Sequence, residues 1–427
     1  MRLLAFLLLF APAVHAQVIL GRASSLDDTN ADFHVPMGLS GSSATEVSRA
    51  VLTSPLGNIV RFCAYSTVDP ANGVNVQSWT LELRLEGADV GGDVVLSEGS
   101  AGIASTVCVT DVVAISTAGQ DLSIQITPAN TPVATGHIRF AWVFLPTTPG
   151  QTWWGVSSGG TNLNDTTTQY LAPHVRGIPN NTEIQTALVI PTAGVVSAFY
   201  GEFSGAAGTG NSYFVDARLC TDANPPVCAD QTVDFTVAGA SEVADNSGAD
   251  TFAVVAGEQV SVQINPDSTP TARHFRGGMT FTPTIFGEFV LGLVSEDPLN
   301  PLATEYAELH TGLAGDWNAT ESAVSSLAGF FTIKAVYARL SAAPDVGVGV
   351  QSFTLGPRDD VADVTDFQVT ITDTDVSGSI TTQDFQGVAP PSDMTWQAVP
   401  ALAPTAATAS LSILAFDPSG QILGGGE

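Results

Sequence analysis

The segment GQDLSIQITPANTP at residues 119–132 returns 138 residues later as GEQVSVQINPDSTP at 257–270, without a gap. A weaker third copy is SDMTWQAVPALAP at 392–404, in which Gln397, Pro400 and Pro404 keep the spacing of the first copy. A period this long is the size of a whole domain rather than of a solenoid repeat. The sequence therefore predicts three tandem copies of one domain.

Within each copy, apolar and polar residues alternate with a period of two, as in LSIQI, VSVQI and WTLELRL. Clusters of Gly, Pro, Asn, Asp and Ser separate these stretches, and no window carries a sustained apolar stripe at helical spacing. The pattern predicts an all-β protein of three tandem antiparallel β-sandwich domains, with either a jelly-roll or an Ig-like strand order. We place a signal peptide at 1–16 and the three β-sandwich repeats at 17–148, 149–285 and 286–427.

The first residues have the features of a secretory signal peptide. Arg2 supplies a positive charge, an apolar run follows at 3–10, and small residues precede a cleavage point after Ala16 that would leave Gln17 as the new N-terminus. A membrane anchor is the alternative, but this apolar run is too short to cross a bilayer. We therefore expect a protein that is secreted, extracellular or held at the cell surface.

The chain is strongly acidic, with 13 basic against 42 acidic residues. An acidic surface repels nucleic-acid phosphates and anionic lipid. We expect no nucleic-acid partner and no membrane insertion.

The four cysteines are predicted to form two disulfides, as is usual in exported chains. Cys220 and Cys228 bracket the turn-rich segment TDANPPV, which predicts a bridge across a hairpin. Cys63 and Cys108 lie on separate apolar strands of the first repeat and form the second predicted pair.

A short strand-like element occurs four times in a chain of three repeats: QVILG at 17–21, QTWWG at 151–155, EFVLG at 288–292 and QILG at 421–424. One copy is therefore spare, at the N-terminal or the C-terminal end. A spare strand can pair with a sheet edge of another molecule, which motivates a hypothesis of head-to-tail self-association. Capping of its own neighbour is the alternative, and we favour it.

Several motifs recur in the same order in each repeat. A Thr-Glu pair opens the copies at 45–46, 182–183 and 320–321, and the second copy continues with GTGNSYF at 208–214, AGEQVSVQINPDSTP at 256–270 and FTP at 281–283. This succession resembles a tandem β-sandwich repeat of uncharacterised secreted bacterial and phage-associated proteins. The third copy departs from it, with PRDDVADVTDF at 357–367. The resemblance implies a repeated β domain and no catalytic residues.

Trp153 and Trp154 are adjacent in one of the short elements. Successive side chains of a strand point to opposite faces, so one indole can enter the core while the other is outside or covered by a neighbouring domain. An exposed indole would stack on a sugar ring of a surface glycan. Packing between domains is the alternative, and we favour it.

The stretch DTDVSGSITTQD at 373–384 has the ligand spacing of a calcium loop. Asp373, Asp375, Ser377 and Asp384 occupy its positions 1, 3, 5 and 12. The last position is Asp rather than the usual Glu, and a strand rather than a helix is predicted before it. We therefore favour a hairpin turn, with weak calcium binding as the alternative and no other cofactor.

No spaced group of catalytic residues recurs in the repeats. The sequence GVSSG at 155–159 matches the G-x-S-x-G hydrolase motif, but the helix that this motif requires is not predicted after it. We expect a secreted non-enzymatic protein with a structural or adhesive role. An extracellular array of carbohydrate-binding modules is the second hypothesis.

Overall fold

Six β-sheets in three consecutive pairs make up this computed structural model. It describes residues 15–24, 26–71, 76–99, 101–102, 105–110, 113–134, 136–173, 177–310, 317–328, 331–345, 350–360, 362–388 and 392–416. The protein is all-β, as predicted, and each pair of sheets packs face to face as a sandwich. Within the described residues, no helix is long and apolar enough to span a membrane.

The first sandwich spans the strands β1 to β12. Its first sheet contains β1 (Gln17–Ser24), β3 (Gly38–Gly41), β5 (Gly57–Ser66), β9 (Val107–Val109), β10 (Val113–Ile115) and β12 (Ile138–Pro146). Its second sheet contains β2 (Asp32–His34), β4 (Val51–Leu52), β6 (Ser78–Leu85), β7 (Ala88–Asp89), β8 (Val94–Ser97) and β11 (Asp121–Ala129). The short 3-10 helix η1 (Glu46–Ser48) precedes β4.

The second sandwich spans β13 to β22. Its first sheet contains β13 (Thr152–Ser157), β16 (Gly194–Phe203), β19 (Ala244–Asn246), β20 (Thr251–Val254) and β22 (Phe275–Pro283). Its second sheet contains β14 (Gln169–Leu171), β15 (Leu188–Val189), β17 (Gly208–Cys220), β18 (Cys228–Gly239) and β21 (Gln259–Asp267). The 3-10 helix η3 (Glu183–Gln185) precedes β15.

The third sandwich spans β23 to β32. Its first sheet contains β23 (Glu288–Val294), β26 (Phe331–Leu340), β30 (Ser377–Val388) and β32 (Ala409–Phe416). Its second sheet contains β24 (Glu305–Glu308), β25 (Ser326–Ala328), β27 (Ser352–Asp359), β28 (Ala362–Asp363), β29 (Val369–Thr372) and β31 (Ser392–Ala401). The 3-10 helices are η4 (Glu321–Ala323) before β25 and η5 (Thr365–Phe367) before β29.

All three sandwiches share one strand order. In the second sandwich, the sheets run β13-β22-β16-β19 and β14-β21-β17-β18. The short strands β15 and β20 lie off these two paths, which leaves eight strand positions. Numbered along the chain, the two orders read 1-8-3-6 and 2-7-4-5, which is a jelly roll and not an Ig-like order. The structure thus selects one of the two topologies that the sequence left open.

The period-two pattern determines which side chains enter each core. Strand β6 alternates without exception between half-buried and buried residues along Ser78–Leu85. It turns into β7 through Glu86 and Gly87, both with positive φ, as a two-residue hairpin turn requires. The central strand β12 differs, because all but one of its residues are buried.

The short elements at the repeat junctions are the first strands of the sandwiches that follow them. Strands β1, β13 and β23 pair antiparallel with β12, β22 and β32, the last strands of the same sandwiches. The spare fourth element is therefore the C-terminal one, QILG at 421–424, which lies outside the described residues. The predicted signal peptide at 1–16 also lies largely outside them.

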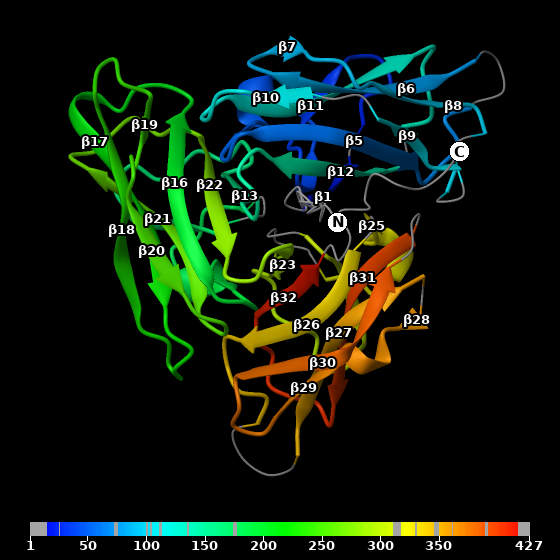
Figure 1. Ribbon diagram of the computed structural model, residues 1–427, viewed down its shortest axis with the longest axis vertical. Helices are drawn as coiled ribbons and strands as arrows, with labels where there is room; N and C mark the ends of the chain where they lie inside the picture. Colours follow the sequence, from blue (N-terminus) through cyan, green and yellow to red (C-terminus); the bar gives the residue numbers. More distant parts are fainter. Residues whose placement is uncertain are drawn as a thin grey trace, which may run out of the picture.

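The three sandwiches form a closed ring (Figure 1). Strand β4 of the first packs on β13, β16 and β22 of the second, and β15 of the second packs on β23, β26 and β32 of the third. Strand β25 of the third packs on β1 and β12 of the first, which closes the ring without a chain connection. Each first strand is consequently buried on both faces, which explains the adjacent apolar residues VIL at 18–20, WW at 153–154 and FVL at 289–291.

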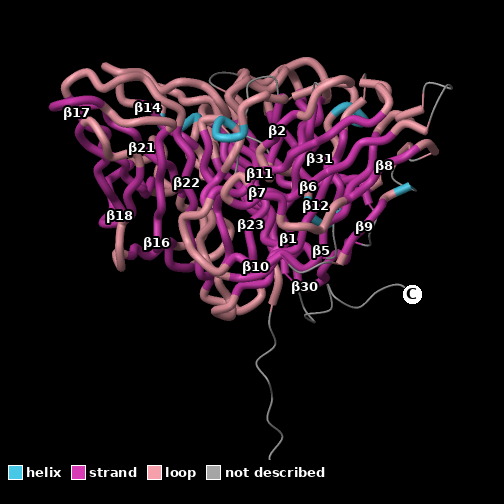
Figure 2. Tube along the Cα trace, turned by 90° about the horizontal axis from the view of Figure 1, so that it is seen from above, coloured by secondary structure: helices cyan, strands magenta, loops and turns pink. Residues whose placement is uncertain are grey.

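The starts of the three first strands meet at the centre of the ring. A small central cavity is lined by His15, Ala16, Gly150, Gln151, Thr152, Gly287 and Glu288. Glu288, with 1 % of its side chain exposed, pairs with Lys334 and accepts a hydrogen bond from Thr192 Oγ1 at 2.6 Å. Figure 2 shows the ring from the side, with many of the connecting loops gathered at one face.

Candidate functional site

A glutamate in the 3-10 helix of each sandwich pairs with an arginine on the fourth strand position. The pairs are Glu46–Arg84 at 3.0 Å, Glu183–Arg218 at 2.5 Å and Glu321–Arg358 at 2.7 Å. The same glutamate oxygen accepts a hydrogen bond from a hydroxyl on the seventh strand position, namely Ser123 at 2.6 Å, Ser261 at 2.9 Å and Thr395 at 2.9 Å. We call this group the Glu–Arg–hydroxyl cluster.

The Glu–Arg–hydroxyl cluster explains the glutamate of the Thr-Glu pair that opens every repeat. Charge-assisted hydrogen bonds fix the 3-10 turn on the second sheet of its sandwich. The chain then enters β4, β15 or β25, the strands that pack on the next sandwich of the ring. The glutamate was predicted as a repeat marker but the arginine was not, although an arginine recurs near the end of each fourth strand.

An ion pair of a different kind joins the first sandwich to the second. Arg276 on β22 donates from Nε to Asp121 of the first sandwich at 2.5 Å, and from Nη1 to the Val47 carbonyl at 3.2 Å. Its Nη2 lies 2.6 Å from Glu202 in its own sandwich. Burial raises the pKa of Asp121 to about 6, against the lowering effect of the Arg276 guanidinium, and Glu202 raises it further.

The same arrangement joins the third and first sandwiches. Arg139 on β12 donates from Nη1 to Asp393 of the third sandwich at 3.0 Å, and from Nη2 to the Ser322 carbonyl at 2.5 Å. It also donates to the Tyr65 hydroxyl, which in turn donates to Asp393. Burial raises the pKa of Tyr65, which keeps this hydroxyl protonated as a donor.

A further ion pair at this interface is almost completely buried. Arg22 of β1 lies 2.6 Å from Glu308 of β24, with 9 % and 4 % of their side chains exposed. Burial raises the pKa of Glu308, and the Arg22 and Arg139 guanidinium groups oppose this shift. The interface between the third and first sandwiches, which no chain segment links, therefore has two described ion pairs, against one at each of the other two interfaces.

The interface between the second and third sandwiches lacks the Asp–Arg pair. The equivalent positions, read from the strand registers, are Gln259 on β21 and Ser410 on β32. Ser410 Oγ accepts a hydrogen bond from the Val189 amide across the interface at 2.8 Å, and Gln259 Nε2 donates to the Ala187 carbonyl of its own sandwich. Two neutral side chains thus replace a carboxylate and a guanidinium.

A different arginine makes the ion pair at this third interface. Arg339 on β26, with 2 % of its side chain exposed, donates from Nη1 to Asp222 at 2.7 Å and from Nη2 to the Ala223 carbonyl. Asp222 and Ala223 belong to the loop between β17 and β18. Burial lowers the pKa of Arg339, while Asp222 raises it.

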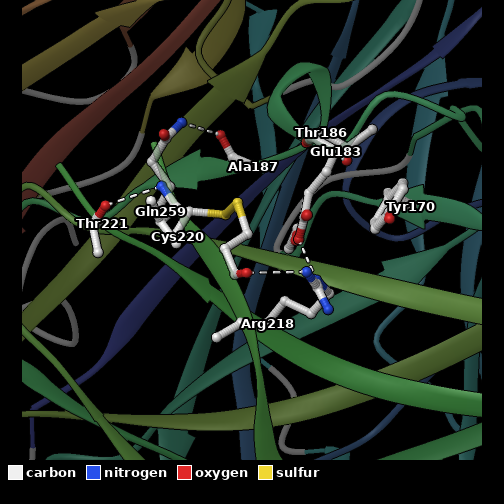
Figure 3. The surroundings of a disulfide bond; sticks show 12 residues. Tyr170, Glu183, Thr186, Ala187, Arg218, Cys220, Thr221 and Gln259 are labelled. Carbon is white, nitrogen blue, oxygen red and sulfur yellow. Dashed lines mark hydrogen bonds and ion pairs between the residues drawn. A yellow bond between two sulfur atoms is a disulfide. The ribbon is translucent and has the colours of Figure 1, made fainter. Parts of the chain in front are cut away.

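The two predicted disulfides are present. Cys63 on β5 pairs with Cys108 on β9, and Cys220 on β17 pairs with Cys228 on β18. Each joins two directly opposed residues of neighbouring strands. Figure 3 shows the second disulfide beside Arg218, which donates to the Cys228 carbonyl at 3.3 Å and to Glu183.

A cavity of about 440 Å³ lies beside this disulfide, between the second and third sandwiches. Its lining is Thr182, Glu183, Ile184, Asn224, Pro225, Pro226, Cys228, Arg339, Leu340, Ser341 and Val376. Both of its charged side chains already have ion-pair partners, Arg218 for Glu183 and Asp222 for Arg339. The cavity shows that this third interface is incompletely filled.

Both tryptophans considered for sugar stacking are buried, with 0 % of each exposed. Trp153 packs in the core of the first sandwich, where its Nε1 donates to the Leu52 carbonyl at 2.9 Å. Trp154 packs in the core of its own sandwich, stacked on Phe281. In this structure neither indole face can receive a sugar ring, and Trp153 has the packing role between sandwiches.

The predicted calcium loop does not fold around one point. Asp373 and Asp375 are exposed in a tight turn, and Ser377 begins β30. Residues 377–381 then run extended along β26, so the chain moves about 13 Å from the turn before it reaches Asp384. The prediction of a hairpin turn is also wrong. The turn connects β29 and β30, which belong to different sheets.

One exposed all-carboxylate group lies among the described residues. The carboxylate oxygens of Glu82, Asp89 and Asp93 are within 4.8 Å of one another. Burial raises the pKa of Glu82, and the two aspartates raise it further. In a second group, Cys220 and Cys228 lie near Glu183 but are joined in the disulfide, which leaves no thiolate to bind a metal.

Comparison with known proteins does not connect the chain to a family. No family model matches it, and no curated protein matches it. Among solved structures, one of infectious bursal disease virus, Gx strain, aligns over 95 % of this chain and 81 % of that chain, with 7 % identity and a TM-score of 0.15.

Proposed function

We propose that this chain is a non-enzymatic extracellular protein with a structural or adhesive role, in which three fused jelly rolls act as one stiff ring. The observation that carries the proposal is the contact of the third sandwich with the first. No chain segment links these two directly, yet Arg139–Asp393 and Arg22–Glu308 join them. Such contacts suit a protein whose task is to hold a shape.

The packing of the sandwiches supports stiffness. Val18 and Leu20 of the first sandwich belong to the apolar core of the third, and Trp153 of the second belongs to that of the first. A core that continues across an interface resists hinge motion, because opening it exposes apolar surface to water. The loops at one face of the ring would then be held at fixed separations, which favours attachment to a surface at several points (Figure 2).

The disulfides support an extracellular location. Both connect neighbouring strands, and disulfides persist in oxidising compartments such as the cell exterior. The expected signal peptide agrees with this location. The carbohydrate-binding hypothesis named Trp153 and Trp154 as the residues that stack on sugar, and both are buried.

The proposal can be tested in the source organism. We expect an antibody against residues 17–427 to detect the chain in the medium or on intact cells, and a strain without the gene to attach less well to surfaces. Retention of the chain inside the cell, or unchanged attachment, would refute the proposal. A glycan array probed with the purified chain tests the second hypothesis, because selective binding of one glycan class would favour it.

A further inference from the structure

The second sandwich differs from the other two at one hairpin. The strands at positions 4 and 5 are joined by two-residue turns in the first and third sandwiches, between the opposed pairs Leu85–Ala88 and Asp359–Ala362. In the second sandwich the strands run one pair further, to Cys220 opposite Cys228, and residues 221–227 form a longer connection. The longer hairpin occurs at the interface where Gln259 and Ser410 replace the Asp–Arg pair.

The extra residues supply the ion pair that this interface otherwise lacks. Asp222 and the Ala223 carbonyl bind the guanidinium of Arg339 on the third sandwich. The loop is otherwise largely open to solvent, because residues 221–225 and Val227 are exposed and Asp222 has 54 % of its side chain accessible. Inside the loop, Thr221 N donates to the Val227 carbonyl at 3.0 Å, and Val227 N donates to Thr221 Oγ1 at 3.1 Å.

The Cys220–Cys228 disulfide closes the base of the loop. A covalent closure limits the conformations that the loop samples when it is not bound to Arg339, so less entropy is lost when Asp222 docks. Cys220 is buried, whereas Cys228 is partly exposed and lines the cavity at this interface. The other disulfide, Cys63–Cys108, lies between β5 and β9 of the first sandwich and does not join residues of this loop.

We propose that the loop 221–227 is a latch on the third sandwich and that reduction of Cys220–Cys228 releases it. A dithiol reductant attacks Cys228 Sγ through one thiolate, breaks the sulfur–sulfur bond and forms a mixed disulfide, while Cys220 leaves as a thiolate and takes up a proton. The second thiol of the reductant then displaces Cys228, so the protein gains two thiols and the reductant becomes a disulfide. The freed loop binds Arg339 more weakly, and the interface beside the 440 Å³ cavity opens.

Hydrogen exchange of the purified chain 17–427 tests this proposal. The probes are the Val189 amide, which bonds to Ser410 Oγ across the interface, and the amides of residues 338–341. In the double variant Cys220→Ser with Cys228→Ser, we expect these amides to exchange about tenfold faster, which is the effect of weakening one charged hydrogen bond. The matched double variant Cys63→Ser with Cys108→Ser should leave them unchanged.

Two further measurements separate a latch from general loss of stability. The amides of residues 138–146, at the interface of the first and third sandwiches, should keep their exchange rates when the latch disulfide is removed. Asp222→Ala should accelerate exchange at Val189 with both disulfides intact, and this variant tests the proposal even if the serine double variant fails to fold. Equal exchange at Val189 in the two double variants, or no effect of Asp222→Ala, would overturn the proposal.

Discussion

Arg276 of the second sandwich donates from Nε to Asp121 of the first at 2.5 Å, and this contact joins residues 155 positions apart in the sequence. Arg139 and Asp393 repeat it between the first and third sandwiches. Two interfaces of the ring therefore use one side-chain arrangement. The third uses another, and this difference leads to the first two predictions.

Replacing Arg276 with Met should lower the free energy of unfolding by about 3 kcal/mol, because Asp121 would stay partly buried without its cation. Urea unfolding followed by circular dichroism measures the change. Arg273→Met is the control, since Arg273 bonds to the Ala206 carbonyl within its own sandwich and is more exposed. Equal losses in the two variants would show that the interface pair does not contribute specifically.

The third interface can be given the arrangement of the other two. The triple variant Gln259→Asp, Arg339→Tyr and Ser410→Arg places on it the side chains that occupy equivalent positions as Asp393, Tyr65 and Arg139. We expect the Leu340 and Ser341 amides of this variant, whose carbonyl acceptors Val376 and Thr408 are unchanged, to exchange slowly even when Cys220 and Cys228 are serine, because the new pair no longer uses the loop. Fast exchange in that background would contradict the equivalence of the three interfaces.

The Glu–Arg–hydroxyl cluster should contribute to stability in every sandwich. Glu321→Gln removes the charge that Arg358 and Thr395 bind, and we expect a loss of about 2 kcal/mol in the free energy of unfolding. Glu98→Gln, at an exposed position, is the matched control. Thermal unfolding of both variants tests this prediction, because only Glu321→Gln should lower the melting temperature. A similar melting temperature for the two would count against a role for the cluster.

A half-buried carboxylate, that of Asp216, makes stability depend on pH in a defined direction. Burial raises the pKa of Asp216 to about 6, and Asp230 and Asp234 raise it further. Since this pKa lies above that of the unfolded chain, the charged form destabilises the fold above pH 6, and the penalty disappears as the pH falls below about 4. Asp216→Asn should therefore melt at a higher temperature than the native chain at pH 7.5.

The same comparison at pH 4 should show little difference between Asp216→Asn and the native chain. Asp366→Asn, at an exposed position in the third sandwich, is the control and should not change the pH dependence. A constant difference in melting temperature across this range would mean that Asp216 does not titrate as expected.

Calcium binding at the turn of residues 373–377 should be weak. The chain leaves this turn in an extended strand, so Asp384 is not in place to complete the ligand set. Calorimetric titration with calcium chloride should give the same heats for the native chain and for the variant with Asp373→Ala and Asp375→Ala. A tight site that the double variant abolishes would restore the calcium-loop hypothesis.

The sequence alone was sufficient to predict the all-β class and the pairing of the cysteines, because both depend on local patterns. The period-two alternation of LSIQI is a property of one strand, and Cys220 and Cys228 flank a single turn. The strand order was not predictable, since jelly-roll and Ig-like sandwiches present the same alternation to their cores. The Thr-Glu pairs were found as repeat markers, but their purpose depends on Arg84, Arg218 and Arg358, which lie 35 to 38 residues later.

The way in which the three copies contact one another could be read only from the three-dimensional contacts. A repeat in the sequence is equally compatible with a string of separate sandwiches and with a closed ring, because contacts such as Arg22–Glu308 join residues that nothing in the local pattern relates. Burial of Trp153 and Trp154 on both faces of one strand likewise follows from the neighbouring sandwich and not from alternation. The periodicity of the side chains was therefore enough to predict a β-sandwich for each copy, whereas the packing of one sandwich on another decided which strand faces stay exposed.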